Sequence, residues 1–277
     1  MNIQEHPIAA DVDSLDDDIQ DLLIRRAVVT ERRCDTAELR PAAQARSLRR
    51  LLTRHSGPMA PRAIVQIWAE LTACAAPDVT LHTVNSEQAA AYRDLARVTF
   101  GSRIPLVVHG TPMAALHACA DNPRDFGLVP LPEGEETALS WWTQLAVAGQ
   151  PGTRVVAMLP FVINDGGPAY PPGYWLASLE QEETADDTTL MLLELNAELS
   201  RTKLVNLLKK SGFDAEILAA SRRTASEAAS FLLLGNRGFV GKADARLADF
   251  PRLAGDAVAR LTLVGGYANP MDAKWAA

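Results

Sequence analysis

Two arginines, Arg26 and Arg33, fall on the apolar face of a helix that the sequence predicts near the N-terminus. Apolar residues recur there at alternating spacings of three and four, which is the period of an amphipathic helix. These residues are Val12, Leu15, Ile19, Leu22 and Val29. A charge buried in such a stripe is costly unless a partner compensates it. The pattern therefore indicates a buried acid or a bound anionic ligand, unless both arginines lie at the edge of the stripe and extend to water.

The N-terminal region uses arginine as its only cationic residue apart from histidine. The first 77 residues contain ten arginines, and the first lysine of the chain is Lys203. A guanidinium forms planar, bidentate hydrogen bonds with a carboxylate, whereas an ammonium does not. This usage favours a carboxylate ligand. The net charge of the whole chain is −7, so we expect no nucleic-acid partner.

Three helices are expected to position these arginines within residues 1–77. The first covers residues 12–33, the second follows Pro41 as far as His55, and the third runs from Ile64 to about Ala76. The fold class expected for this part is an all-α three-helix module. Its long first helix has too little to pack on within one chain, so we expect a homodimer.

Short apolar strands and helices alternate over residues 78–182, which predicts an α/β region with a mostly parallel sheet. Strands are expected at 80–84, 105–109, 127–131, 154–162 and 174–179, and helices at 87–99, 112–120 and 138–145. The acidic stretch 181–187 has the composition of a linker.

Residues 183–277 have the order β-α-β-β-α-β, which predicts a ferredoxin-like α+β domain. The expected strands are 189–195, 216–221, 230–234 and 260–265, and the expected helices are 200–210 and 243–258. Such small domains often bind a ligand or a second copy of themselves.

Cysteine and histidine offer no metal or disulfide chemistry. Cys34, Cys74 and Cys119 are too few and too scattered for a disulfide framework, and the five histidines lack the spacing of a zinc site. We expect no metal and no cofactor. No apolar run approaches the ~18 residues of a membrane span, and the acidic N-terminal sequence lacks the features of a secretory signal. We therefore expect a cytoplasmic protein with no membrane partner.

The helical region resembles the AroQ-type chorismate mutases. The resemblance rests on the run from Leu15 to Arg26, on Arg40-Pro41, on Leu48-Arg-Arg-Leu-Leu52 and on the segment from Ile64 to Leu71. It implies an isomerase that rearranges chorismate to prephenate in aromatic amino acid biosynthesis. That reaction is unimolecular and needs no nucleophile, proton carrier or cofactor. The protein has to hold a dicarboxylate in its reactive conformer and stabilise negative charge on the ether oxygen.

The resemblance also implies roles for individual residues. Arg26 matches a carboxylate-binding arginine of the family, and Arg40 joins it in the expected substrate-binding set. Arg33 lies near the position of a family lysine, which is Ala37 here, and is expected to replace it in binding and catalysis. Gln44 stands where a donor to the ether oxygen is expected.

Two further positions depart from the chorismate mutase pattern. A first-helix arginine of the family is Ala9 here, and a polar position of its third helix is Ala75. These departures leave open an alternative function, which is a non-catalytic ligand-binding or regulatory protein that keeps the chorismate mutase fold.

The middle region resembles the periplasmic-binding-protein-like domain of prephenate dehydratase. The segments Ala96-Arg-Val-Thr-Phe-Gly101 and Asp125-Phe-Gly-Leu-Val-Pro-Leu-Pro-Glu133 carry this resemblance. The opening motif of the family is replaced by Leu81-His-Thr-Val-Asn-Ser86, and no acid is placed to expel hydroxide, so we expect no dehydratase activity. The pair Trp141-Trp142 is interpreted as a core or interdomain anchor.

The C-terminal region resembles an ACT domain, so that the three parts together resemble a bifunctional chorismate mutase/prephenate dehydratase. Ala220-Ser-Arg-Arg223 stands in place of the family's E-S-R-P, and Leu263-Val-Gly-Gly-Tyr267 is similar to its terminal L-G-x-Y. The resemblance implies a domain that senses an aromatic amino acid or joins two chains. A plain structural domain is an equally good interpretation.

Overall fold

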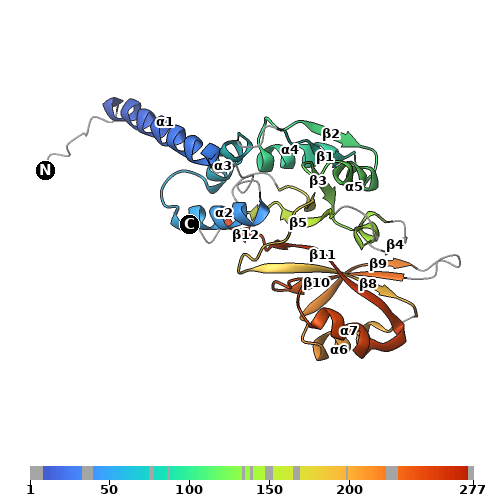
Figure 1. Ribbon diagram of the computed structural model, residues 1–277. Coiled ribbons are helices and arrows are strands. Elements are labelled where there is room, and N and C mark those ends of the chain that lie inside the picture. Colours follow the sequence, from blue (N-terminus) through green and yellow to red (C-terminus); the bar gives the residue numbers. More distant parts are fainter. Residues whose placement is uncertain are drawn as a thin grey trace.

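A ten-stranded mixed sheet runs through the computed structural model of the protein (Figure 1). The structure describes residues 9–32, 40–74, 78–85, 88–132, 135–137, 140–146, 152–164, 169–197, 199–222 and 230–273. The strand order is β2-β1-β3-β7-β5-β11-β8-β10-β9-β4, and a separate two-stranded sheet pairs β12 with β6. The protein is therefore of the mixed α/β class.

The bounds of the elements are as follows. The strands are β1 (Leu81–Val84), β2 (Leu106–His109), β3 (Phe126–Pro130), β4 (Glu135–Thr137), β5 (Arg154–Leu159), β6 (Val162–Ile163), β7 (Gly173–Ala177), β8 (Asp187–Leu195), β9 (Ala215–Arg222), β10 (Ser230–Arg237), β11 (Val258–Ala268) and β12 (Met271–Asp272). The helices are α1 (Ala9–Arg32), α2 (Pro41–Arg54), α3 (Pro61–Ala73), α4 (Ala89–Phe100), α5 (Pro112–Asp121), α6 (Arg201–Lys210) and α7 (Arg246–Ala254), with 3₁₀ turns η2 (Trp141–Ala146) and η3 (Gly255–Ala257). Within these described segments, no helix is both long and apolar enough to cross a membrane.

The first half of the sheet has a helix on each face. Strands β1, β2 and β3 are parallel, whereas β7 is antiparallel to both of its neighbours, so the expectation of a mostly parallel sheet holds only for the first three strands. Helix α4 packs on one face through Leu95, and α5 packs on the other through Leu116. The prediction of an α-helix over residues 138–145 was wrong. Residues 141–146 form a 3₁₀ turn in which Trp141 and Trp142 are buried, as expected of core residues.

The last part of the chain has the expected ferredoxin-like topology. Strands β11, β8, β10 and β9 are adjacent in that order and antiparallel. Helices α6 and α7 cover the same face (Figure 1). Leu204 and Leu208 of α6 and Phe250 of α7 share a buried cluster with Met191 and Leu193 of β8. Residues 189–193 of β8 are all buried, and successive side chains face opposite sides of the sheet. Met191 and Leu193 therefore pack on the helices, whereas Leu190 and Leu192 belong to the cluster on the other face.

A single close approach joins the two halves of the sheet. Strand β11 is parallel to β5 and pairs with it through Gly265 and Val155. Gly265 has a φ of +130°, and a Cβ at this position would meet the Val155 backbone. Glycine is therefore required for the two halves to form one sheet. Because the sheet is continuous, the domain boundaries near residues 77 and 182 stay a prediction.

The N-terminal helices do not enclose a core of their own. Leu52 of α2 and Ile64 of α3 share a buried cluster with Val162 of β6 and Ala273. Helix α3 also packs against α4. The expected all-α three-helix module is therefore not confirmed, because α2 and α3 use apolar surface from the rest of the chain to bury their own.

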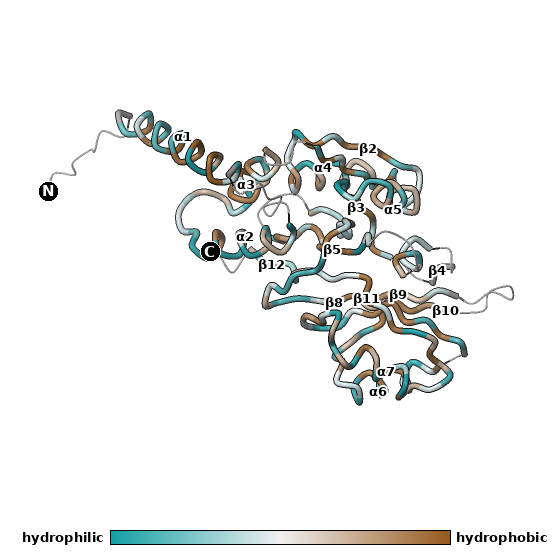
Figure 2. Tube along the Cα trace, in the orientation of Figure 1, coloured by the Kyte–Doolittle hydropathy of each residue, from teal (hydrophilic) through white to brown (hydrophobic). Residues whose placement is uncertain are grey.

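Helix α1 extends away from the rest of the molecule (Figure 1), and hydrophobic positions recur along it (Figure 2). The predicted apolar stripe is present but unburied. The exposed fractions are 49% for Val12, 53% for Leu15, 54% for Ile19, 59% for Leu22 and 52% for Val29. The sequence was thus right about the stripe, and the described part of this chain does not cover it.

Residues 181–187 are not the loose acidic linker that their composition predicted. Thr184 and Asp187 are buried, and the Asp187 carboxylate accepts hydrogen bonds from the Thr184 backbone N–H at 2.8 Å and from the Thr184 hydroxyl at 2.7 Å. Asp187 is also the first residue of β8. The segment is therefore a fixed connection, held by side chains that composition alone does not reveal.

Candidate functional site

A cleft of about 500 Å³ lies between the N-terminal helices and the sheet. Helices α2 and α3 form one wall, which includes Leu48 and Trp68. Residues of β5, β7 and β11 form the other, which includes Trp175 and Tyr267. This volume lies within the range of sites for small organic ligands, and the mixture of apolar walls with a few polar groups is typical of them.

Three of the four predicted site residues line this cleft. Arg26 comes from the last turns of α1, Arg40 directly precedes α2, and Gln44 lies in the first turn of α2. Arg33 lies outside the described residues. Pro41 at the first position of α2 fixes the helix start, and the Gln44 N–H donates to the Arg40 carbonyl one turn earlier, at 3.1 Å.

Arg26 is partly buried. Its Nη1 atom donates a hydrogen bond to the Leu71 carbonyl of α3 at 3.3 Å, and the Thr30 hydroxyl donates to the Arg26 carbonyl at 3.0 Å. Its neighbour Arg25 is exposed. The apolar stripe of α1 that carries Arg26 is exposed, so packing along α1 does not bury this side chain. Arg26 is instead held at the cleft by α3.

Arg40 already contacts a carboxylate of this chain. Its Nη1 atom donates to Glu182 Oε1 at 2.7 Å, and Arg46 Nη2 donates to Glu182 Oε2 at 3.1 Å. The hydrogen bond from Arg40, and after it the one from Arg46, keeps the pKa of Glu182 below its ordinary value although burial opposes this. Glu182 itself lines the cleft. A ligand carboxylate that binds the Nη1 atom of Arg40 has to compete with that of Glu182.

Gln44 and Arg50 also present polar groups to the cleft. Gln44 is partly buried, and Arg50 is exposed. Neither side chain has a hydrogen-bond partner among the residues that the structure describes. The Gln44 amide therefore remains available as a donor.

The sheet wall contributes polar groups that the sequence did not single out. Trp175 is 1% exposed and its ring packs edge-to-face on Phe100, with 4.5 Å between ring centroids. The indole nitrogen of Trp175 and the amide nitrogen of Gln181 are buried without an acceptor in the described part of the chain. Within a strand of apolar residues, Trp175 has the sequence signature of a core residue, so no pattern pointed to the cleft.

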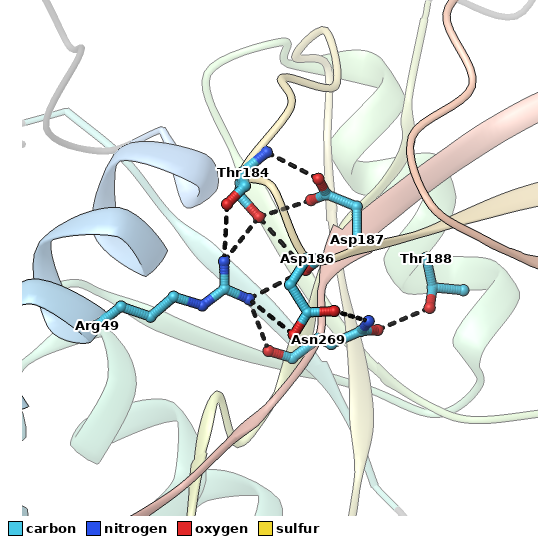
Figure 3. Close-up of polar contacts among 6 residues, drawn as sticks. All are labelled: Arg49, Thr184, Asp186, Asp187, Thr188 and Asn269. Carbon is cyan, nitrogen blue, oxygen red and sulfur yellow. Dashed lines mark hydrogen bonds and ion pairs between the residues drawn. The ribbon is translucent and has the colours of Figure 1, made fainter. Parts of the chain in front are cut away.

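Arg49 fixes α2 against the sheet and thereby forms the cleft (Figure 3). Its Nη1 atom donates to the carbonyl and the hydroxyl of Thr184, each at 3.0 Å. Its Nη2 atom donates to the carbonyls of Asp186 at 3.0 Å and Asn269 at 3.1 Å. The guanidinium also lies 5.4 Å from the centre of the Phe161 ring. One side chain thus joins α2, the connection before β8 and the end of β11.

Replacing Arg49 with alanine is expected to lower the free energy of unfolding by about 2–3 kcal/mol, because it leaves several part-buried carbonyls without a donor. Chemical denaturation measures this loss. Arg49→Lys should recover less than half of it, since an ammonium cannot reach both pairs of acceptors. Arg54→Ala, at an exposed position in the last turn of α2, serves as the control and should stay within about 0.5 kcal/mol of wild type. Equal denaturation midpoints for the Arg49 and Arg54 variants would exclude the anchoring role.

A second polar cluster lies away from the cleft. His82 Nε2 is 3.2 Å from Asp125 Oδ2, and His82 Nδ1 is 2.9 Å from His109 Nε2. Asp125 also accepts the Thr80 backbone N–H at 2.9 Å. Burial, and after it the charge of His82, lowers the pKa of His109. No group of three or more metal-binding side chains occurs in the described segments. We interpret the cluster as a satisfied internal network between β1, β2 and β3.

The comparisons with known proteins are distant. No protein-family model matches the sequence, and no curated protein is similar to it. Among solved structures, the quorum-quenching acylase GqqA is 12% identical, with 68% of this chain and 94% of that chain covered and a TM-score of 0.47. A prephenate dehydratase from Streptococcus mutans is 14% identical, with 69% and 100% covered and a TM-score of 0.46. The prephenate dehydratase from Arthrobacter aurescens, in complex with L-Phe, is 12% identical, with 69% and 90% covered and a TM-score of 0.45.

Proposed function

We propose that the cleft binds a small dicarboxylate of the chorismate type and that the protein is a chorismate mutase-like isomerase. The observation that carries the proposal is that Arg26 and Arg40, which the resemblance implies as substrate-binding residues, and Gln44, which it implies as the donor to the ether oxygen, line one cleft. Arginines from two separate helical segments are suited to holding two carboxylates of one ligand.

The proposed reaction makes few chemical demands on the cleft. The rearrangement of chorismate to prephenate is unimolecular, so the rate gain comes from holding the reactive conformer and from stabilising charge on the ether oxygen. In this proposal Arg26 and Arg40 hold the carboxylates, and the Gln44 amide donates to the ether oxygen. The apolar side chains of Leu48 and Trp68 exclude water from the ring of the ligand.

Turnover by the purified full-length chain tests the proposed isomerase activity. The loss of chorismate is followed by its absorbance, without a coupling enzyme. Conversion above the uncatalysed rate supports the proposal, provided that Gln44→Leu lowers it. A rate equal to the uncatalysed one at high protein concentration would contradict it.

A non-catalytic binding or regulatory protein is the second candidate function. Ala37 and Ala75 favour it, since they stand where the chorismate mutase family has polar residues. Binding of chorismate without turnover would support this candidate. Among the candidate functions, prephenate dehydratase activity ranks last. Formation of phenylpyruvate from supplied prephenate would overturn this ranking.

The exposed stripe of α1 leads to the prediction that two chains associate through this helix. Ile19→Glu together with Leu22→Glu should convert a dimer into a monomer, because charges on the stripe cannot be buried in an apolar interface. Light scattering on the full chain measures the mass. The control, Asp17→Ala with Asp21→Ala on the opposite face, should remain dimeric. A wild-type protein that is monomeric at micromolar concentration would remove the proposed homodimer.

A further inference from the structure

The carboxylate of Glu182 lies between two guanidinium groups at the edge of the cleft. Arg40 contacts one of its oxygens and Arg46 contacts the other, at 2.7 and 3.1 Å. Two arginines that converge on the two oxygens of one carboxylate form a carboxylate-binding site in geometric terms. Glu182 occupies this site in the ligand-free chain.

The connection that carries Glu182 does not depend on this contact for its position. Arg49 holds the Thr184 carbonyl, and the Asp187 carboxylate accepts the Thr184 N–H. Arg46 Nη1 additionally donates to the Glu183 carbonyl at 3.0 Å. Residues 183–187 are therefore anchored through backbone groups, and the Glu182 side chain can leave without releasing them.

The contact between Glu182 and the two arginines is weak enough to be exchanged. The side chains of Arg40 and Glu182 are 46% and 30% exposed, and that of Arg46 is 48% exposed. Ion pairs with this exposure contribute little to stability, because water and salt screen them. The adjacent Gln181 amide nitrogen is buried without an acceptor in the part of the chain that is described.

We propose that Arg40, which lines the cleft, and Arg46, which lies just outside its lining, form a carboxylate subsite at the edge of the cleft and that Glu182 is its built-in competitor. A ligand carboxylate replaces that of Glu182, which then moves to solvent. This inference rests on the proposed function for the identity of the natural ligand. The subsite itself requires only that the ligand carries a carboxylate. It adds Arg46 to the ligand-binding residues and makes Glu182 the residue that sets the affinity.

The test compares Glu182→Gln with wild type by calorimetry on the full chain, with chorismate and malonate as probes. Removing the internal carboxylate should raise the affinity for both probes about fivefold, which is the shift expected when an exposed ion pair no longer competes. Adding Arg46→Ala to Glu182→Gln should lower the affinity again. The matched control is Glu183→Gln, the neighbouring exposed acid outside the cleft lining, which should bind as wild type does.

The outcomes separate this inference from the proposed function. If malonate binds Glu182→Gln more tightly but chorismate binds neither protein, the subsite stands and the chorismate proposal fails. If Glu182→Gln and wild type bind malonate and chorismate with equal affinity, or if no variant binds either probe, the competitor role is wrong. Should Glu182→Gln fold poorly, Glu182→Ala is measured under the same criteria.

Discussion

Replacing Arg26 with alanine is expected to lower the affinity for chorismate by about 2–4 kcal/mol, because the guanidinium is the principal carboxylate anchor of the cleft. The side chain is partly buried and lines the cleft, where it can meet a ligand carboxylate. The fold should persist, since the hydrogen bond from Arg26 to the Leu71 carbonyl is long, at 3.3 Å, and only part-buried. Calorimetric titration gives the affinity, and circular dichroism checks the fold.

The neighbouring residue supplies a matched control for Arg26. Arg25 is exposed and does not line the cleft, so Arg25→Ala should bind chorismate nearly as wild type does. Arg26→Lys should recover little affinity, because an ammonium cannot form the planar pair of hydrogen bonds. If Arg25 and Arg26 proved equally dispensable, the arginines would be a solvated pair with no role in binding.

Replacing Gly265 with alanine is expected to lower the free energy of unfolding by at least about 3 kcal/mol. The backbone of Gly265 has a φ of +130°, which disfavours any residue with a Cβ, and the added methyl group would meet the Val155 backbone. Because this contact pairs β11 with β5, we expect the two halves of the sheet to separate at lower denaturant concentration. Chemical denaturation measures the decrease in stability.

Gly238 provides the control for Gly265, which pairs β11 with β5. It also has a positive φ, of +91°, but a Cβ there would meet nothing within 4 Å. Gly238→Ala should therefore cost only the backbone strain, about 1 kcal/mol. The additional destabilisation in Gly265→Ala measures the clash with Val155. Equal destabilisation of the two variants would show that the contact between Gly265 and Val155 accommodates a side chain.

The sequence predicted those parts of the fold that depend on local patterns. The ferredoxin-like order followed from the succession of strand-like and helix-like segments along residues 183–277. Local signals also predicted the helix starts at Pro41 and at Ser200. The hydroxyl of Ser200 caps α6. The sequence did not predict the 3₁₀ turn at Trp141, because a short apolar run does not distinguish such a turn from an α-helix.

Long-range contacts account for what the sequence did not reveal about the site. Arg26, Arg40 and Gln44 were identified because their positions follow from helical register and from a family pattern. Arg49 binds carbonyls 135 to 220 residues away, and Arg46 meets Glu182 across 136 residues. No spacing rule connects such positions, so the acidic connection was interpreted as a linker.

Direct titration of chorismate into the full-length chain tests the central claim, that the cleft holds a dicarboxylate through Arg26 and Arg40. We expect saturable binding at submillimolar concentration, with one site per chain, and its disappearance in Arg26→Ala. No saturable binding at millimolar chorismate, or equal binding by wild type and Arg26→Ala, would contradict the claim.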